Sequence, residues 1–174
     1  MANTFEFDFP EDIKDRYPES INALLPTYFR FTMNRTPKMT YFCQTASIPS
    51  VTLTDVAVPN PFVPIKTPSK MEFDDLSITF VVDENLTNWL EIYNWMRSCT
   101  NVENYNEFRS VNTHLTTANL IVLNSGKQPR LNVTFDGLYP KNLSSIDFSS
   151  VLIDPEPIQS TVIFGYRSYS IEQY

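Results

Sequence analysis

The sequence predicts a mainly β protein, a β-sandwich or partly closed β-barrel with one flanking α-helix. Segments of alternating apolar and polar residues recur along the 174 residues, and this period is typical of half-buried strands. Thirteen prolines accompany only three glycines, which favours strand edges and extended connections over helices. One long stretch changes to helical spacing. The length suits a single domain, residues 1–174, with one core.

Residues 1–26 form an acidic N-terminal arm in which Phe5, Phe7 and Phe9 alternate with Glu6 and Asp8, as in a strand. A lone terminal strand needs a sheet edge. The arm is therefore either an edge strand of its own domain or a contact to a neighbouring subunit. Residues 18–25 are expected to form a short helix.

The next segments are expected to be strands and a long loop. Phe29, Phe31 and Met33 alternate with polar neighbours, the sequence NRTPK predicts a turn, and residues 40–48 predict the returning strand. Residues 58–70 contain four prolines in thirteen positions. Because proline cannot donate to a central ladder, we expect a Pro-rich extended loop there.

The stretch 73–96, FDDLSITFVVDENLTNWLEIYNWM, joins a strand to a helix. Leu76, Ile78, Phe80 and Val82 alternate, and from residue 85 the spacing becomes helical. Asp83 or Asn85 is expected to cap the helix. The stripe expected to brace the sheet is Leu86, Trp89, Leu90, Tyr93 and Met96. Ile92 and Trp95 widen this apolar surface.

Three segments complete the chain. Residues 97–113 predict a polar loop, and residues 120–135 a hairpin whose turn holds Gly126 and Pro129. One last strand is expected from Ser160 to about Ile171.

The sequence shows no motif of catalytic residues. His114 is the single histidine, and Cys43 and Cys99 are too few and too widely spaced for a disulfide framework. Cys43 is expected to be a small core residue. The adjacent pairs Asp74–Asp75 and Asp83–Glu84 are better explained by solvation and capping than by acid–base catalysis. With three glycines there is no phosphate-binding loop. We therefore expect no enzyme activity, no cofactor and no metal.

The charge and hydropathy exclude further classes. A net charge of −7 and a pI of about 4.6 argue against a surface that grips nucleic acid, which requires basic patches. The N-terminus lacks the features of a signal peptide, and no stretch approaches the roughly 20 apolar residues of a membrane span. A reduced cytosolic setting during synthesis and no membrane contact are expected.

Four motifs in order resemble the tail tube protein of contractile-tailed, T4-like bacteriophages. They are FCQTASIPSVTL (42–53), KMEFDDLSITFVVDENLTNWLEIYNWM (70–96), VTFDGLYPKNLSSIDF (133–148) with a G-L-Y-P turn, and STVIFGYRSYSI (160–171). The resemblance covers residues 28–171 and rests on the order and spacing of the motifs.

This resemblance implies a structural virion protein of the phage tail, assembled in the host cytoplasm. Six copies would form a ring whose strands join into one inner barrel, and rings would stack into a tube that passes DNA without binding it specifically. The implied partners are further copies of the chain, the tail sheath, the baseplate or tube initiator, and the tail terminator. The Pro-rich loop would reach the next ring through Pro59, Pro61, Phe62, Pro64 and Ile65. The arm would contact a neighbour through Phe5, Phe7 and Phe9, and Asp55, Glu72 and Asp75 would line the lumen.

Two kinds of alternative stay open. A tube initiator, a tail terminator or another baseplate-proximal protein would share the fold. A monomeric β-sandwich that binds carbohydrate would use Trp89, Trp95 and some of the nine tyrosines as an aromatic platform.

Overall fold

The computed structural model describes residues 23–59, 62–63, 65–100, 114–151 and 156–174. The predicted arm strand, most of the short helix at 18–25 and the greater part of the loop at 97–113 lie outside these residues. Residues 97–100 of that loop belong to a helix instead.

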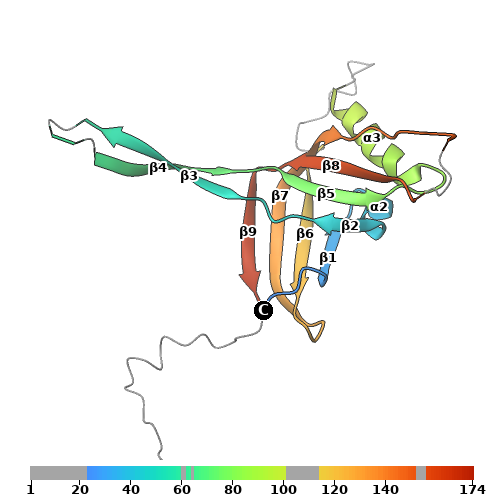
Figure 1. The fold of residues 1–174 in the computed structure, drawn as a ribbon, viewed down its shortest axis with the longest axis horizontal. Coiled ribbons are helices and arrows are strands. Elements are labelled where there is room, and N and C mark those ends of the chain that lie inside the picture. The colour runs from blue at the N-terminus through green and yellow to red at the C-terminus, as the bar shows by residue number, and fades with distance from the viewer. Residues whose placement is uncertain (1–22, 60–61, 64, 101–113, 152–155) are drawn as a thin grey trace, which may run out of the picture.

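Four antiparallel strands form the first layer, which we call the array (Figure 1). They are β1 (Phe29–Met33), β6 (Thr116–Leu123), β7 (Pro129–Leu143) and β9 (Ser168–Gln173), in the order β1-β6-β7-β9. The predicted hairpin at 120–135 is confirmed as the β6–β7 pair. Phe31 and Met33 point into the core, as their alternation predicts.

The second layer crosses the array and shares β7 with it (Figure 1). It contains β2 (Cys43–Ala46), β5 (Leu76–Val81), β8 (Gln159–Gly165) and the second half of β7, in the order β2-β5-β8-β7. The two layers make a sandwich-like fold, as predicted, and the sheet does not close into a barrel.

The strand β7 serves both layers because it bends at Gly137, whose φ is 65°. Residues before the bend pair with β6 and β9, and residues from Tyr139 onward pair with β8. Glycine adopts this left-handed conformation without a steric penalty. The predicted turn at G-L-Y-P is therefore wrong, since the strand continues through it.

The core lies between the two layers and beneath the helices. Alternating positions of β5, with the burial pattern expected for a half-buried strand, supply Leu76, Ile78 and Phe80. The other buried apolar residues come from β1, β6, β7, β8 and the helices at residues 37–41 and 87–100: Phe31, Met33, Met39, Ile92, Trp95, Ala118, Leu120, Val133, Phe135, Leu138, Val162 and Phe164.

A short helix, α2 (Pro37–Tyr41), occupies part of the predicted turn and returning strand. Proline is well tolerated in the first turn of a helix, and Met39 on this helix is fully buried. The remaining strand, β2, pairs with β5 and does not return to β1. The prediction of a β1–β2 hairpin is therefore wrong, because helix formation redirects the chain to the second layer.

The long helix α3 (Thr87–Thr100) packs on the sandwich with a side that coincides only in part with the predicted stripe, since Trp89 and Met96 of that stripe pack against the core. Ile92 and Trp95 are buried, while Leu90 and Tyr93 are 42% and 45% exposed. The pattern was misleading because the buried side also contains Asn88, a polar residue that an apolar stripe omits.

The predicted last strand is in fact two strands, β8 and β9, separated at Tyr166 and Arg167. The first belongs to the second layer and the next to the array. Continuous alternation cannot reveal this division, since both strands have the same period.

The Pro-rich segment is also different from the expected loop. Strands β3 (Val51–Val58) and β4 (Ile65–Phe73) form a separate two-stranded hairpin that projects far from the sandwich (Figure 1). Pro68 is tolerated in β4 because it lies next to a register shift in a ladder only two strands wide.

Candidate assembly surfaces

The array ends in two open edges. Within the described residues, β1 pairs only with β6 and β9 pairs only with β7. The backbone N–H of Tyr174 donates to Arg130 O at 3.1 Å, so the alternation of an antiparallel ladder turns the N–H of Ile171 away from β7. Such a row of outward donors and acceptors is a template for pairing with another chain. The edges lie at opposite sides of the same array (Figure 1).

The face of the array opposite the core is polar and has balanced charge. It consists of side chains that alternate with core residues: Arg30, Thr32, Thr117, Asn119, Ile121, Arg130, Asn132, Thr134, Asp136, Ser168, Ser170 and Glu172. Two arginines offset two carboxylates. Hydrogen bonds such as Asn132 Nδ2 to Thr134 Oγ1 at 3.3 Å connect neighbouring side chains along it. The chain's net charge of −7 is thus located elsewhere.

The core side of the array remains open at β9. Ile171 lies opposite the buried Val133, on the core face, yet it is 50% exposed. Tyr169, two residues earlier, contacts Phe135 and Phe73 with ring centroids 5.8 and 5.2 Å apart. The core therefore continues as an apolar surface at this edge.

The β3–β4 hairpin exposes large apolar side chains along its whole length. These are Val51, Leu53, Val56, Val58, Phe62, Val63, Ile65, Met71 and Phe73. A two-stranded hairpin of this kind is at best marginally stable in water alone, and contiguous exposed apolar surface marks an interaction site.

Hydrogen bonds fix the root of this hairpin on the sandwich. The Ser50 hydroxyl donates to the Asp74 carboxylate, and the Asp74 N–H donates to Ser50 O at 3.1 Å. The Tyr166 hydroxyl donates to Asp74 O at 2.6 Å. Burial raises the pKa of Tyr166 to about 12, so the hydroxyl keeps its proton at physiological pH and the bond persists. The hairpin therefore leaves the sandwich in a defined direction.

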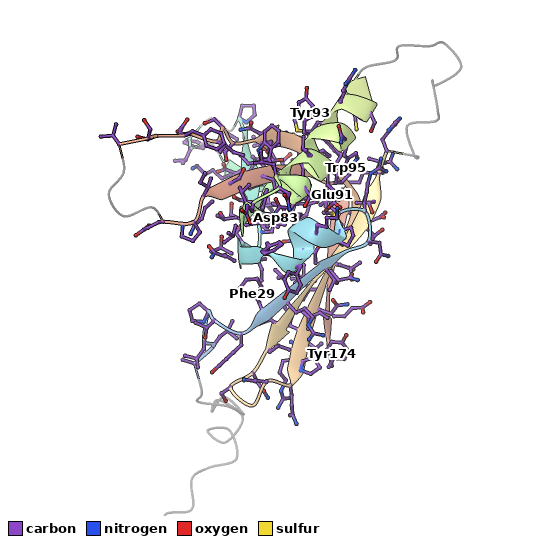
Figure 2. All side chains as sticks on the ribbon, turned by 90° about the vertical axis from the view of Figure 1, so that its right-hand side faces the viewer. Phe29, Asp83, Glu91, Tyr93, Trp95 and Tyr174 are labelled. Atoms are coloured by element: carbon purple, nitrogen blue, oxygen red, sulfur yellow. The ribbon has the colours of Figure 1, made fainter. Side chains whose placement is uncertain are left out.

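A stacked aromatic pair lies where the core side of α3 meets its outward side, since Trp89 is half-buried against the core and Tyr93 is 45% exposed. The rings of Trp89 and Tyr93 are 5.5 Å apart and nearly parallel, at 10°. Trp95, on the inner side, is only 3% exposed and donates from Nε1 to His114 O at 2.9 Å (Figure 2). The predicted platform of two tryptophans is therefore wrong, because one of them is core.

The joint between β5 and α3 is held by Asn88. Its Nδ2 donates to Val81 O at 2.7 Å, and its Oδ1 accepts from the backbone N–H groups of Asp83 and Trp89 at 3.2 and 2.9 Å. Asp83 in turn accepts a hydrogen bond from the Thr87 hydroxyl at 2.8 Å. Of the two predicted capping residues, Asp83 thus bonds the first helical residue. Only one sign of this role of Asn88 is visible in the sequence, namely its position in the first turn of the predicted helix.

The described residues offer no cluster of three or more metal-ligating side chains. Burial raises the pKa of the Cys43 thiol to about 11, which suits the predicted core role and makes it a poor nucleophile. No helix in the described part of the chain has the length and apolar character needed to span a membrane.

The three acids predicted to face a lumen each lie beside a lysine. Asp55 and Glu72 are on the hairpin, 3.3 Å from Lys66 Nζ and 3.2 Å from Lys70 Nζ. Asp75 precedes β5 and lies 2.7 Å from Lys141 Nζ. The structure does not bring the three together, and their lumen position stays a prediction.

The predicted inter-ring contacts gather at the tip of the hairpin. Pro59, Phe62 and Ile65 are exposed there. Pro61 and Pro64 lie outside the described residues. Their role in stacking also stays a prediction.

Open sheet edges and a projecting apolar hairpin define a structural β-protein suited to assembly by strand pairing. The family model of the phage tail tube protein matches residues 1–172, and the chain belongs to this family. It is therefore a structural, tail-associated protein of the tail tube type.

Solved structures of contractile injection systems share the fold. A chain of the tube-terminating cap of the anti-feeding prophage is 12% identical, with a TM-score of 0.64 over 91% of this chain and 97% of that one. A chain of an extracellular contractile injection system, the PVC sheath–tube complex in the extended state, is 10% identical, with a TM-score of 0.61 over 96% and 99%. A chain of the PVC sheath/tube terminator is 12% identical, with a TM-score of 0.64 over 88% and 99%. No curated protein sequence matches the chain.

Proposed function

We propose that this protein is the subunit of a phage inner tail tube, in which copies form closed rings, six to a ring, that stack and conduct DNA. The observation that carries the proposal is the array with an open strand at each side. Pairing β9 of one copy with β1 of the next would satisfy both edges and continue the sheet around a ring. It would also cover Ile171.

In this proposal the polar face of the array lines the channel. Side chains that are short, uncharged or mutually neutralising give DNA phosphates neither a cationic patch to bind nor a strong field to overcome. This assignment differs from the acidic lining predicted at Asp55, Glu72 and Asp75. The sheath would surround the tube, the baseplate would start its assembly, and the virion tail would be its location after assembly in the host cytoplasm. This structural role requires no catalytic activity.

A tail terminator is the second candidate. The fold likeness to structures of a tube-terminating cap and of a sheath/tube terminator is as high as that to a sheath–tube complex. A terminator would form one ring and would not stack on itself, so long tubes of the purified protein would favour the tube subunit.

The proposed edge pairing is tested with Ile171→Pro. Because the N–H of Ile171 points away from β7, proline removes a donor from the open edge without removing one from the β7–β9 ladder. We expect a folded monomer by circular dichroism and no rings by native mass spectrometry. Ile171→Thr keeps the N–H and serves as the matched control, which should still form rings. Rings of Ile171→Pro at the same protein concentration as wild type would contradict the pairing.

A further inference from the structure

The ladder between β1 and β6 is short and forms one open edge of the array. It runs from the pair Phe29–Val122 to the pair Met33–Ala118, and within the described residues β1 pairs with no other strand. A strand held by a single ladder frays from its ends, and fraying lowers the fraction of subunits that present a complete edge. The contacts that hold the ends of this ladder therefore bear on assembly.

Trp95 of α3 closes one end of the ladder. Its Nε1 donates to His114 O at 2.9 Å, and His114 lies two residues before β6. Arg35 lies two residues after β1, and its Cζ is 4.9 Å from the centroid of the Trp95 ring. Because Met33 pairs with Ala118 in an antiparallel ladder, both contacts fall just beyond its last pair. Trp95 thus joins the two strands where their pairing ends.

Trp95 is itself anchored on the second layer. Its side chain is 3% exposed, and its ring centroid lies 5.9 Å from that of Phe164 on β8. A cation over the face of a tryptophan is attracted by the ring, most strongly where the ring is shielded from water. The contact with Arg35 therefore links the edge strand of the first layer to the second layer through α3.

The other edge strand, β9, is held from a different part of the molecule. The ring centroid of Tyr169 lies 5.8 Å from that of Phe135 on β7 and 5.8 Å from that of Tyr166, which precedes β9. These contacts do not involve α3. The two edges thus differ in what holds them, and β9 is an internal reference for β1.

We infer that Trp95 and Arg35 are positioning residues of the β1 edge, which they hold in the conformation that pairs with a neighbouring copy. We call Trp95, Arg35 and His114 the clamp. The inference rests on the proposed function for the identity of the partner. The clamp itself belongs to the single subunit and is measurable there.

Amide hydrogen exchange of the monomer, resolved by residue with NMR below the ring-forming concentration, reports on the clamp. The N–H of Leu123 donates to Tyr28 O at 3.0 Å. The alternation of an antiparallel ladder then directs the N–H groups of Arg30 and Thr32 toward β6. Their exchange rates measure how often β1 leaves β6.

Arg35→Met removes the charge and keeps the length of this exposed side chain. We expect the Arg30 and Thr32 amides to exchange about five times faster than in wild type. The amides of Ser170 and Glu172 on β9, which face β7 in the same way, should keep their wild-type rates. Native mass spectrometry should show that the variant needs more protein to form rings, because fewer subunits present β1.

Three further variants separate the clamp from charge and from overall stability. Arg35→Lys keeps a cation and should recover most of the protection. Lys127→Met, at an exposed position of the β6–β7 turn, removes a positive charge away from Trp95 and should behave as wild type. In a Trp95→Leu background, Arg35→Met should have no further effect, because the ring on which it acts is gone. If Trp95→Leu does not fold by circular dichroism, the comparison of Arg35→Met with Arg35→Lys decides.

Wild-type exchange of β1 in Arg35→Met, or equal acceleration in β1 and β9, would overturn the clamp. Faster exchange of β1 with ring formation at the wild-type concentration would overturn its link to assembly. Wild type that forms no rings at any concentration would overturn the proposed function, while the exchange rates of the monomer would still decide whether the clamp exists.

Discussion

Asn88 shows how one polar side chain fixes the direction of a helix. It is fully buried where β5 ends and α3 begins, and its side chain forms hydrogen bonds with three backbone groups of that joint. Leu86, just before the helix, has a φ of 57°, a conformation that costs a non-glycine residue energy. The joint therefore contains local strain that the Asn88 hydrogen bonds and the packing of α3 must offset.

We predict that Asn88→Ala lowers the free energy of unfolding by about 2 kcal/mol, because it leaves Val81 O and the Asp83 N–H buried without their partner. Urea denaturation of the monomer measures the change. Asn94→Ala, at an exposed position of the same helix, should change stability by less than about 0.5 kcal/mol. Equal effects of the two substitutions would show that the joint does not depend on Asn88.

At the scale of the element, β7 decides how the two layers meet. Its 15 residues could not pair with β9 and β8 in succession without the bend at Gly137. A Cβ at this position would lie 2.8 Å from Arg167 Cγ and Cδ and 3.1 Å from its Cβ. Conformation and close approach thus both require glycine here.

We expect Gly137→Ala to destabilise the protein by about 1–2 kcal/mol from the left-handed φ alone, and further through the contact with Arg167. At this chain length each kcal/mol lowers the melting temperature by roughly 2–4 °C, which thermal denaturation resolves. Gly126→Ala is the control, because the nearest atom to its Cβ would be the Asn124 side-chain oxygen at 3.3 Å and its φ is ordinary. A melting temperature for Gly137→Ala equal to that of the control would contradict the role of the bend.

At the scale of the whole molecule, the positions of the charged side chains matter more for the proposed channel than the net charge of the chain does. The chain is strongly acidic, but the array face that we assign to the channel carries two arginines, Arg30 and Arg130, and two carboxylates, Asp136 and Glu172. The acidic residues predicted for the lumen lie beside lysines on the hairpin and before β5.

Thr117→Lys tests which face lines the channel. Thr117 is exposed on the array face, and one lysine per copy would repeat around every ring. We expect assembled tubes of this variant to retain DNA at low salt and to release it as salt rises, because phosphate contacts are salt-dependent. Leu90→Lys, on the outward side of α3, places the same charge away from the array. Retention that is equal in the two variants would contradict the channel assignment.

The spacing of apolar residues was sufficient to predict the positions of several helices and strands. Alternation located β1, β5 and the β6–β7 hairpin, and helical spacing located α3, because each of these has one side against the core. Cys43 was correctly placed near the core by residue type alone. The missing catalytic and metal motifs, and the order of the four quoted segments, pointed to a structural tail tube protein, and the family match confirms that family.

The tertiary structure decided the rest, for physical reasons that no single segment contains. Whether the Pro-rich segment is a loop or a strand depends on β3 lying beside it, and which side of α3 is buried depends on hydrogen bonds from Asn88 to the end of β5. The alternating run at 160–171 divides into β8 and β9 because these strands pair with parts of β7 on either side of the bend at Gly137. Sequence by itself determined the period of each strand, and pairing between distant strands determined which surfaces were left for assembly.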